Sequence, residues 1–108
     1  MQFDDYQKGA RTTAVYPERF RVVYPALGLA SEAGEVAGKI KKVLRDQAGD
    51  FEAGPRDALQ DELGDVLWYL AVLAADLGLS LDQIAAHNLE KLRSRQARGR
   101  IGGSGDQR

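Results

Sequence analysis

Two short segments of the sequence repeat one pattern: an acid, any residue, a glycine and a second acid. They are Glu32–Glu35 and Glu62–Asp65, and each lies within an apolar run that has helical spacing. Residues three apart share a helix face, so each segment directs two carboxylates to one side. Like charges at this spacing repel, and a glycine inside a helix costs about 1 kcal/mol relative to alanine. Because the chain accepts both costs twice, the pattern indicates four carboxylates that converge on a divalent cation.

The composition limits the classes to which the chain can belong. Its 108 residues suffice for one domain with a single core, and its net charge of -1 is not that of a nucleic-acid-binding protein. Cysteine is absent, which excludes disulfides and thiolate metal sites. The first residues are acidic, unlike a signal peptide, and no apolar run approaches the roughly 20 residues of a membrane span. We therefore expect a cytoplasmic protein with no nucleic-acid or membrane partner.

The apolar spacing and the turn residues predict an all-α fold of four helices. The expected ranges, in chain order, are about 3–13, 26–45, 57–77 and 80–98. Residues 46–56 form a loop, Gly78 ends the third helix, and Ser80 begins the fourth. We expect residues 1–98 to form one domain. Residues 99–108 form a glycine-rich tail, either a disordered end or a loop whose backbone N–H groups reach phosphate.

The third helix contains a segment that is apolar on nearly all sides, Val66–Ala75. Such a helix is buried all round, and one small four-helix domain offers barely enough surface to cover it. A homo-oligomer would supply the missing cover. The alternative is a central helix that its own three neighbours wrap, with some exposed leucine.

The acidic pairs border the apolar arcs of their helices, so they can face each other at the rim of the core. Unpaired carboxylates crowded there would take up protons or repel, and bound cations resolve this. The glycine of each pattern either permits close backbone approach or leaves room beside the cation. The one histidine, His87, lies far along the fourth helix, where we expect a surface or structural role. An all-oxygen site favours Mg²⁺, with Mn²⁺ as a substitute; the alternative is a solvated stripe of charge.

Further side chains continue these faces and are candidates for holding a polyphosphate beside the metal. They are Lys39, Lys42, Asn88, Lys91 and Arg95. The structural alternative is that Lys39 stabilises its helix by pairing with Glu35, and that cations near a helix end complement its dipole. Tyr69 follows Glu62 by seven residues and points along the acidic face, where its ring can contact a nucleoside. Core packing is the competing explanation for Tyr69 and the better one for Trp68.

Residues 29–36, 61–69 and 88–92, together with Arg95, resemble the signature of MazG-type nucleoside triphosphate pyrophosphohydrolases. The closing residues 98–106 resemble the end of small phage and bacterial members. The resemblance covers nearly the whole chain, and the motifs are fairly specific in combination.

The resemblance implies the four-helix fold of the all-α NTP pyrophosphatases, which form dimers or tetramers, with the site between the second, third and fourth helices. It implies Mg²⁺-dependent hydrolysis of an NTP or dNTP to the monophosphate and pyrophosphate, as in nucleotide-pool house-cleaning. The implied metal ligands are Glu32, Glu35, Glu62 and Asp65. Glu32 and Glu35 are the expected catalytic residues, and Glu35 orients or deprotonates the water. The implied contacts are Lys39, Lys91 and Arg95 to phosphate and Tyr69 to the nucleoside.

One position departs from the family pattern. Many members open the first motif with two adjacent glutamates, and Ser31 stands in the first place here. The four central ligands are intact, so only a water-orienting role of that first glutamate is in question.

Three other functions remain open. The nearest is phosphoribosyl-ATP pyrophosphohydrolase of histidine synthesis, an enzyme on the same fold that the tail and the Tyr24-Pro25 opening fit less well. A non-catalytic oligomerisation or nucleotide-sensing module predicts stabilisation by ligand without product. A purely structural bundle predicts no effect of Mg²⁺ on melting.

Overall fold

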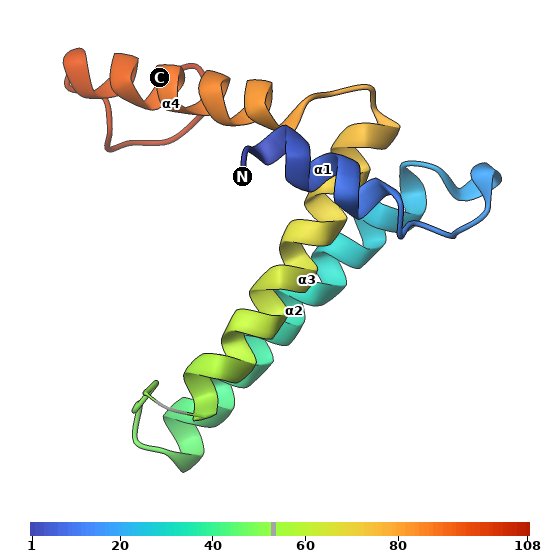
Figure 1. Cartoon of the computed structure of the whole chain (residues 1–108). Coiled ribbons are helices and arrows are strands. Elements are labelled where there is room, and N and C mark those ends of the chain that lie inside the picture. The colour runs from blue at the N-terminus through green and yellow to red at the C-terminus, as the bar shows by residue number, and fades with distance from the viewer. Residues whose placement is uncertain (53) are drawn as a thin grey trace.

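The computed structural model describes residues 1–52 and 54–108, and it contains four α-helices and one short 3-10 helix (Figure 1). In chain order these are α1 (Phe3–Arg11), η1 (Glu18–Phe20), α2 (Val23–Asp46), α3 (Gly54–Asp76) and α4 (Leu81–Ala97). No described residue lies in a strand. The predicted all-α class with four helices is therefore confirmed.

The two longest helices, α2 and α3, pack side by side as an antiparallel hairpin (Figure 1). Each begins about three residues before its predicted start, at Val23 and at Gly54. Pro25 and Pro55 lie in the first turns, where a missing N–H removes no helical hydrogen bond, so neither proline prevents the earlier start. Ala53, in the predicted loop 46–56, lies outside the described residues.

Helix α1 crosses one end of the hairpin and contacts both α3 and α4 (Figure 1). The Asp4 carboxylate accepts a hydrogen bond from Ser80 Oγ at 2.8 Å, and Gln7 Nε2 donates to the carbonyl of Leu79 at 2.9 Å. Ser80 Oγ also accepts from the Gln83 N–H at 3.2 Å, as expected for the cap of the fourth helix. The first helix thus holds the start of the last.

Helix α4 leaves the hairpin instead of covering it (Figure 1). Gly78 ends α3 with φ +72°, as predicted, and the axes of α3 and α4 are then bent by 102°. One chain therefore does not surround α3 with its other three helices. No single helix among the described residues is long and apolar enough to cross a membrane, and α3 with α4 meets that measure only as a bent pair.

The buried core is small and lies where α1 crosses α3. Trp68 packs against it, as predicted, and donates a hydrogen bond to Thr13 Oγ1 at 2.8 Å. The hairpin keeps large apolar side chains in solvent, among them Leu27 at 67% and Leu63 at 55% exposed. The accessible surface is 7701 Å², against about 5,900 Å² for a compact protein of this mass. The radius of gyration is 16.7 Å, against about 13 Å for a compact domain of this length. The buried core residues are Ala10, Ala71, Val72, Ala74 and Leu81.

Candidate functional site

Three carboxylates meet between α2 and α3, and we call them the carboxylate cluster: Glu32, Glu62 and Asp65. One carboxylate oxygen from each lies within 4.8 Å of the others. Glu62 and Asp65 are three apart on α3 and share a face, and α2 presents Glu32 to that face. The two acidic segments of the sequence therefore face each other across the hairpin.

Glu35, the fourth predicted ligand, lies one turn along α2 from Glu32 and is exposed. It is outside the carboxylate cluster. Burial raises the pKa of the Glu32 carboxyl, and the adjacent carboxylates of Glu62, Asp65 and Glu35 raise it further. A cation bound among these carboxylates would offset the part of this shift that their negative charges cause.

Lys39 extends from α2 toward the carboxylate cluster, with its Nζ 3.6 Å from Oε1 of Glu62. The lysine that the sequence pattern assigned to phosphate thus partly neutralises one acid of the carboxylate cluster. Lys42, one turn further along, is exposed, and with Lys39 it lines a hollow of about 300 Å³ near the loop end of the hairpin.

Tyr69 lies beside the carboxylate cluster. Its burial raises the pKa of the phenol, and the neighbouring Tyr24 hydroxyl and the negative charges of Glu32 and Asp65 raise it further. The rings of Tyr24 and Tyr69 are 6.3 Å apart, centroid to centroid. Gly28 makes room for this arrangement, because a Cβ at that position would lie 2.1 Å from Cε1 of Tyr69. An aromatic surface therefore borders the acids.

The glycines of the two acidic segments have no close neighbour. A Cβ at Gly34 or Gly64 would meet nothing within 4 Å. Close backbone approach within one copy therefore does not explain these two glycines. The close approach occurs instead at Gly28, which the sequence reasoning missed. Its position four residues before Glu32, on the same helix face, was the available signal.

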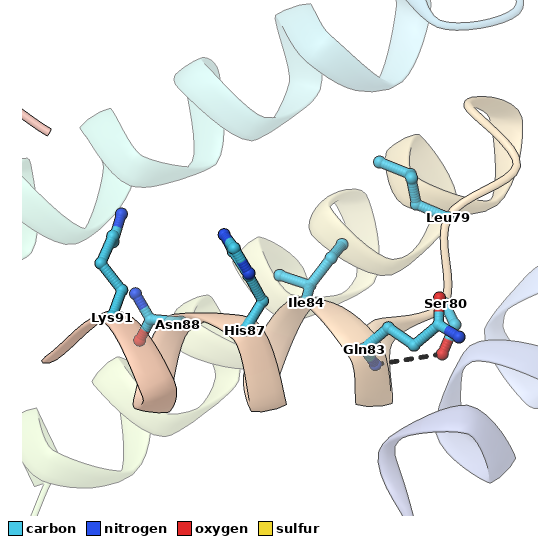
Figure 2. Close-up of a pocket in the computed structure, with 7 residues that line it drawn as sticks. All are labelled: Leu79, Ser80, Gln83, Ile84, His87, Asn88 and Lys91. Atoms are coloured by element: carbon cyan, nitrogen blue, oxygen red, sulfur yellow. Dashed lines mark hydrogen bonds between the residues drawn. The ribbon is translucent and has the colours of Figure 1, made fainter. Parts of the chain in front are cut away.

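The predicted residues on α4 form a separate group. Asn88 and Lys91 line a hollow of about 350 Å³ with Ile84 and His87, and Figure 2 shows these side chains along one side of the helix. Since α4 contacts α1 and departs from the hairpin, one chain does not bring this group to the carboxylate cluster. The predicted site between the second, third and fourth helices is not assembled within one copy.

The C-terminal tail folds back onto α4 and occupies its cations. Arg95 is only 4% exposed, and its Nη2 donates to the Asp106 carbonyl at 2.7 Å and to its Oδ1 at 3.3 Å. Lys91 Nζ lies 3.2 Å from the same Oδ1. The bonds from Lys91 and Arg95 lower the pKa of Asp106. Sequence reasoning missed Asp106, because its contact depends on a reversal of the chain that no local pattern signals.

Comparisons with known proteins identify relatives over most of the chain. The model of the MazG nucleotide pyrophosphohydrolase domain matches residues 25–99. The Gene 37 protein of Mycobacterium phage L5 is 47% identical over 114 aligned positions, which cover 100% of both chains. No solved structure matches the chain significantly. The matched region contains the carboxylate cluster and the cations of α4, and it ends before most of the tail.

Proposed function

Because the chain belongs to the MazG nucleotide pyrophosphohydrolase family, we propose that it hydrolyses nucleoside triphosphates to the monophosphate and pyrophosphate, with Mg²⁺ held by the carboxylate cluster. Membership of the family implies an activity of the pyrophosphohydrolase type, and divalent metals are general in the family. The observation that carries the proposal is the convergence of three carboxylates within 4.8 Å across α2 and α3. Lys39 and Tyr69 lie at the border of that cluster.

The donor set fits a hard divalent cation. Glu32, Glu62 and Asp65 offer oxygen ligands alone, which suits Mg²⁺, with Mn²⁺ as a substitute. Burial first, and then the neighbouring carboxylates, raise the pKa of Glu32, and a cation would offset the contribution of those carboxylates. When bound, Mg²⁺ supplies polarisation of the phosphate and lowers the pKa of water.

The residues of the chain supply the remaining chemistry of the proposed reaction. Glu35 is exposed one turn from Glu32, where it can orient the attacking water and accept its proton. The water oxygen bonds to the α-phosphorus, and the bond from that phosphorus to the bridging oxygen breaks as pyrophosphate leaves. Lys91 and Arg95 are the proposed partners of the departing charge, with Asn88 and Lys42 at the edges of the substrate. Tyr69 would contact the nucleoside.

We further propose that the chain acts as a homodimer or homotetramer. The cations lie on α4, which contacts α1 and departs from the hairpin that holds the carboxylate cluster, so a second copy is the simplest way to complete the site. The surface exceeds that of a compact protein by about 1,800 Å², which is of the size that stable interfaces bury. Leu27, Leu44 and Leu63 are more than half exposed on the hairpin and supply apolar contacts for such an interface.

The test is release of pyrophosphate from a panel of NTPs and dNTPs with Mg²⁺, Mn²⁺ or chelator. We expect metal-dependent release of equal amounts of monophosphate and pyrophosphate. Phosphoribosyl-ATP belongs in the panel, and preference for it would favour the histidine-synthesis enzyme. Binding of nucleotide without any product would support a non-catalytic module and contradict the proposal.

The role of Glu35 has its own test. Glu35→Gln keeps the helix and removes only the acidity, so we expect far-UV circular dichroism to be unchanged and turnover to be lost. Retained turnover in this variant would contradict the assignment of Glu35 while leaving the substrate class untouched.

A further inference from the structure

Asp76, the last residue of α3, is a buried carboxylate outside the carboxylate cluster. It is 4% exposed, and it lies at a helix C-terminus, where the helix dipole disfavours negative charge. A buried carboxylate in that position requires strong compensation from its neighbours. The compensation shows which parts of the chain Asp76 joins.

The partners of Asp76 all come from α1 and from the connection between α1 and α2. Its Oδ1 accepts from Arg11 Nη1 at 2.6 Å, and its Oδ2 accepts from the Tyr16 hydroxyl at 2.5 Å and the Val22 N–H at 2.9 Å. Arg21 Nη2 donates to the Asp76 carbonyl at 2.7 Å. One carboxylate therefore fixes the connection at both of its ends.

The backbone is strained where Asp76 holds it. Val22 has φ 66° and ψ −52°, and the Val23 N–H donates to the Arg21 carbonyl at 2.6 Å, which defines a γ-turn of the positive-φ kind. A β-branched residue in this region costs on the order of 1–3 kcal/mol. Strain of this size persists only where the surrounding contacts over-determine the conformation, as the bond to Asp76 does here.

A series of aromatic rings leads from Asp76 to the carboxylate cluster. Tyr16, whose hydroxyl donates to Asp76, stacks on Tyr24 with ring centroids 4.9 Å apart and planes 24° apart. Tyr24 lies 6.3 Å from Tyr69, which borders Glu32. Asp76 therefore holds the Tyr16 ring, and the Tyr24 ring, which lies next to Tyr69, stacks on Tyr16.

We infer that Asp76 is a positioning residue for nucleoside recognition: through Tyr16 it holds Tyr24 and Tyr69 as an aromatic surface beside the carboxylate cluster. The inference rests on the proposed function, since the surface has a role only if a nucleotide binds at those acids. It assigns the base and sugar to the aromatic side and leaves the phosphates to the acidic side. A merely structural Asp76 would affect the binding of both parts of the substrate alike.

The test compares ligands with and without a nucleoside. Asp76→Asn keeps the shape and removes the charge, and Tyr16→Phe removes one hydroxyl and leaves the bonds from Arg11 and Val22 in place. In Asp76→Asn we expect KM for the nucleoside triphosphate to rise about tenfold with kcat within about twofold. Calorimetry with Mg²⁺ should show a similar loss for the nucleoside monophosphate and no more than a twofold change for pyrophosphate.

The control is Asp46→Asn, at the last residue of α2, where an exposed carboxylate pairs with Arg45. This variant should behave as the wild type in every assay. Tyr16→Phe should show the same pattern as Asp76→Asn with a smaller change, and it carries the test if Asp76→Asn does not fold. Equal losses for monophosphate and pyrophosphate, or no loss for either, would overturn the inference. Absence of pyrophosphate release from the wild type would instead contradict the proposed function.

Discussion

The carboxylate cluster and the cationic side of α4 carry opposite charges and differ in how far the chain itself satisfies them. In the carboxylate cluster three acids converge, and Lys39 is the cation that the described residues place beside them. On α4, Lys91 and Arg95 share the carboxylate of Asp106, and Arg95 is buried beneath the tail. One region has negative charge that a cation from solution would offset, whereas the two cations of the other are already paired with one carboxylate of the same chain.

This difference shows what each region needs before it can act. In the proposed reaction the carboxylate cluster would need a divalent cation, and α2 and α3 already hold its three acids together. In the same reaction the cations of α4 would have to exchange Asp106 for a phosphate, because both groups would use the same donors. The following predictions test or sharpen this contrast.

The largest effect is expected from Glu62→Gln. It removes a carboxylate of the cluster together with the partner of Lys39, so pyrophosphate release should fall at least about a hundredfold. The matched control is Asp61→Asn, since the adjacent acid is exposed and outside the carboxylate cluster. Similar rates for both variants would show that the convergence of the acids has no catalytic meaning.

Mg²⁺ should stabilise the wild-type protein against unfolding. At a concentration one hundred times the dissociation constant, the expected gain is about 2.7 kcal/mol, measured as a shift in thermal or urea unfolding. Glu32→Gln should reduce the shift, and Lys91→Met should leave it intact, because the two regions are separate within one chain. A shift that depends on Lys91 would break the comparison.

Gly28→Ala should disturb the aromatic border of the carboxylate cluster. The new Cβ would overlap the Tyr69 ring, so the free energy of unfolding should fall by about 1–3 kcal/mol. Gly34→Ala meets open space and should raise it by up to about 1 kcal/mol. Chemical denaturation of both variants measures the difference, and loss of stability in Gly34→Ala would contradict the open surroundings of that residue.

Asp106→Asn tests the pairing of the tail carboxylate with Lys91 and Arg95 on α4. It weakens the hold of the tail on Lys91 and Arg95, so KM for the nucleoside triphosphate should fall a few-fold if the phosphates take those donors. Steady-state kinetics at two salt concentrations measure this effect. An increase in KM would show that Asp106 orients the two cations for the substrate.

The smallest effects concern pH, and the two regions should respond with opposite sign. The folded pKa of Asp106 is lowered from 3.8, so its contribution to stability is present above that value and is lost as the pH falls. The folded pKa of Glu32 is raised from 4.5, so its contribution is present below that value and is lost as the pH rises through the folded pKa. Without Mg²⁺, Glu32→Gln should therefore be more stable than the wild type at pH 7, with the difference vanishing below about pH 4. Urea unfolding of the wild type and of Glu32→Gln across this pH range measures how the difference in stability disappears.

The helices and the acidic pairs were predictable because both depend on local spacing. Apolar residues three and four apart define α2 and α3, and the same spacing places Glu62 and Asp65 on one face. When two such helices pack as a hairpin, Glu32 lies opposite these two acids. Periodicity could not place Glu35, because at the edge of a face small differences in rotation decide whether a side chain joins the cluster or faces solvent.

The remaining features depend on contacts between distant parts of the chain. The sequence predicts that Gly78 ends the third helix. The bend of 102° that follows depends on the way Asp4 and Gln7 hold the start of α4. The burial of Asp76 was indicated only indirectly, by its position four residues after the fully buried Val72. The pairing of Asp106 with Arg95 had no local signal at all.

The small core has a consequence for how this protein responds to dilution. A chain that exposes Leu27, Leu44 and Leu63 and keeps few residues fully buried gains much of its stability from association in the oligomer that we propose. For a dimer that unfolds to two chains, each tenfold dilution lowers the free energy of unfolding by about 1.4 kcal/mol. The melting temperature should then rise with protein concentration, and the abundance of the chain would help to determine how much of it is folded.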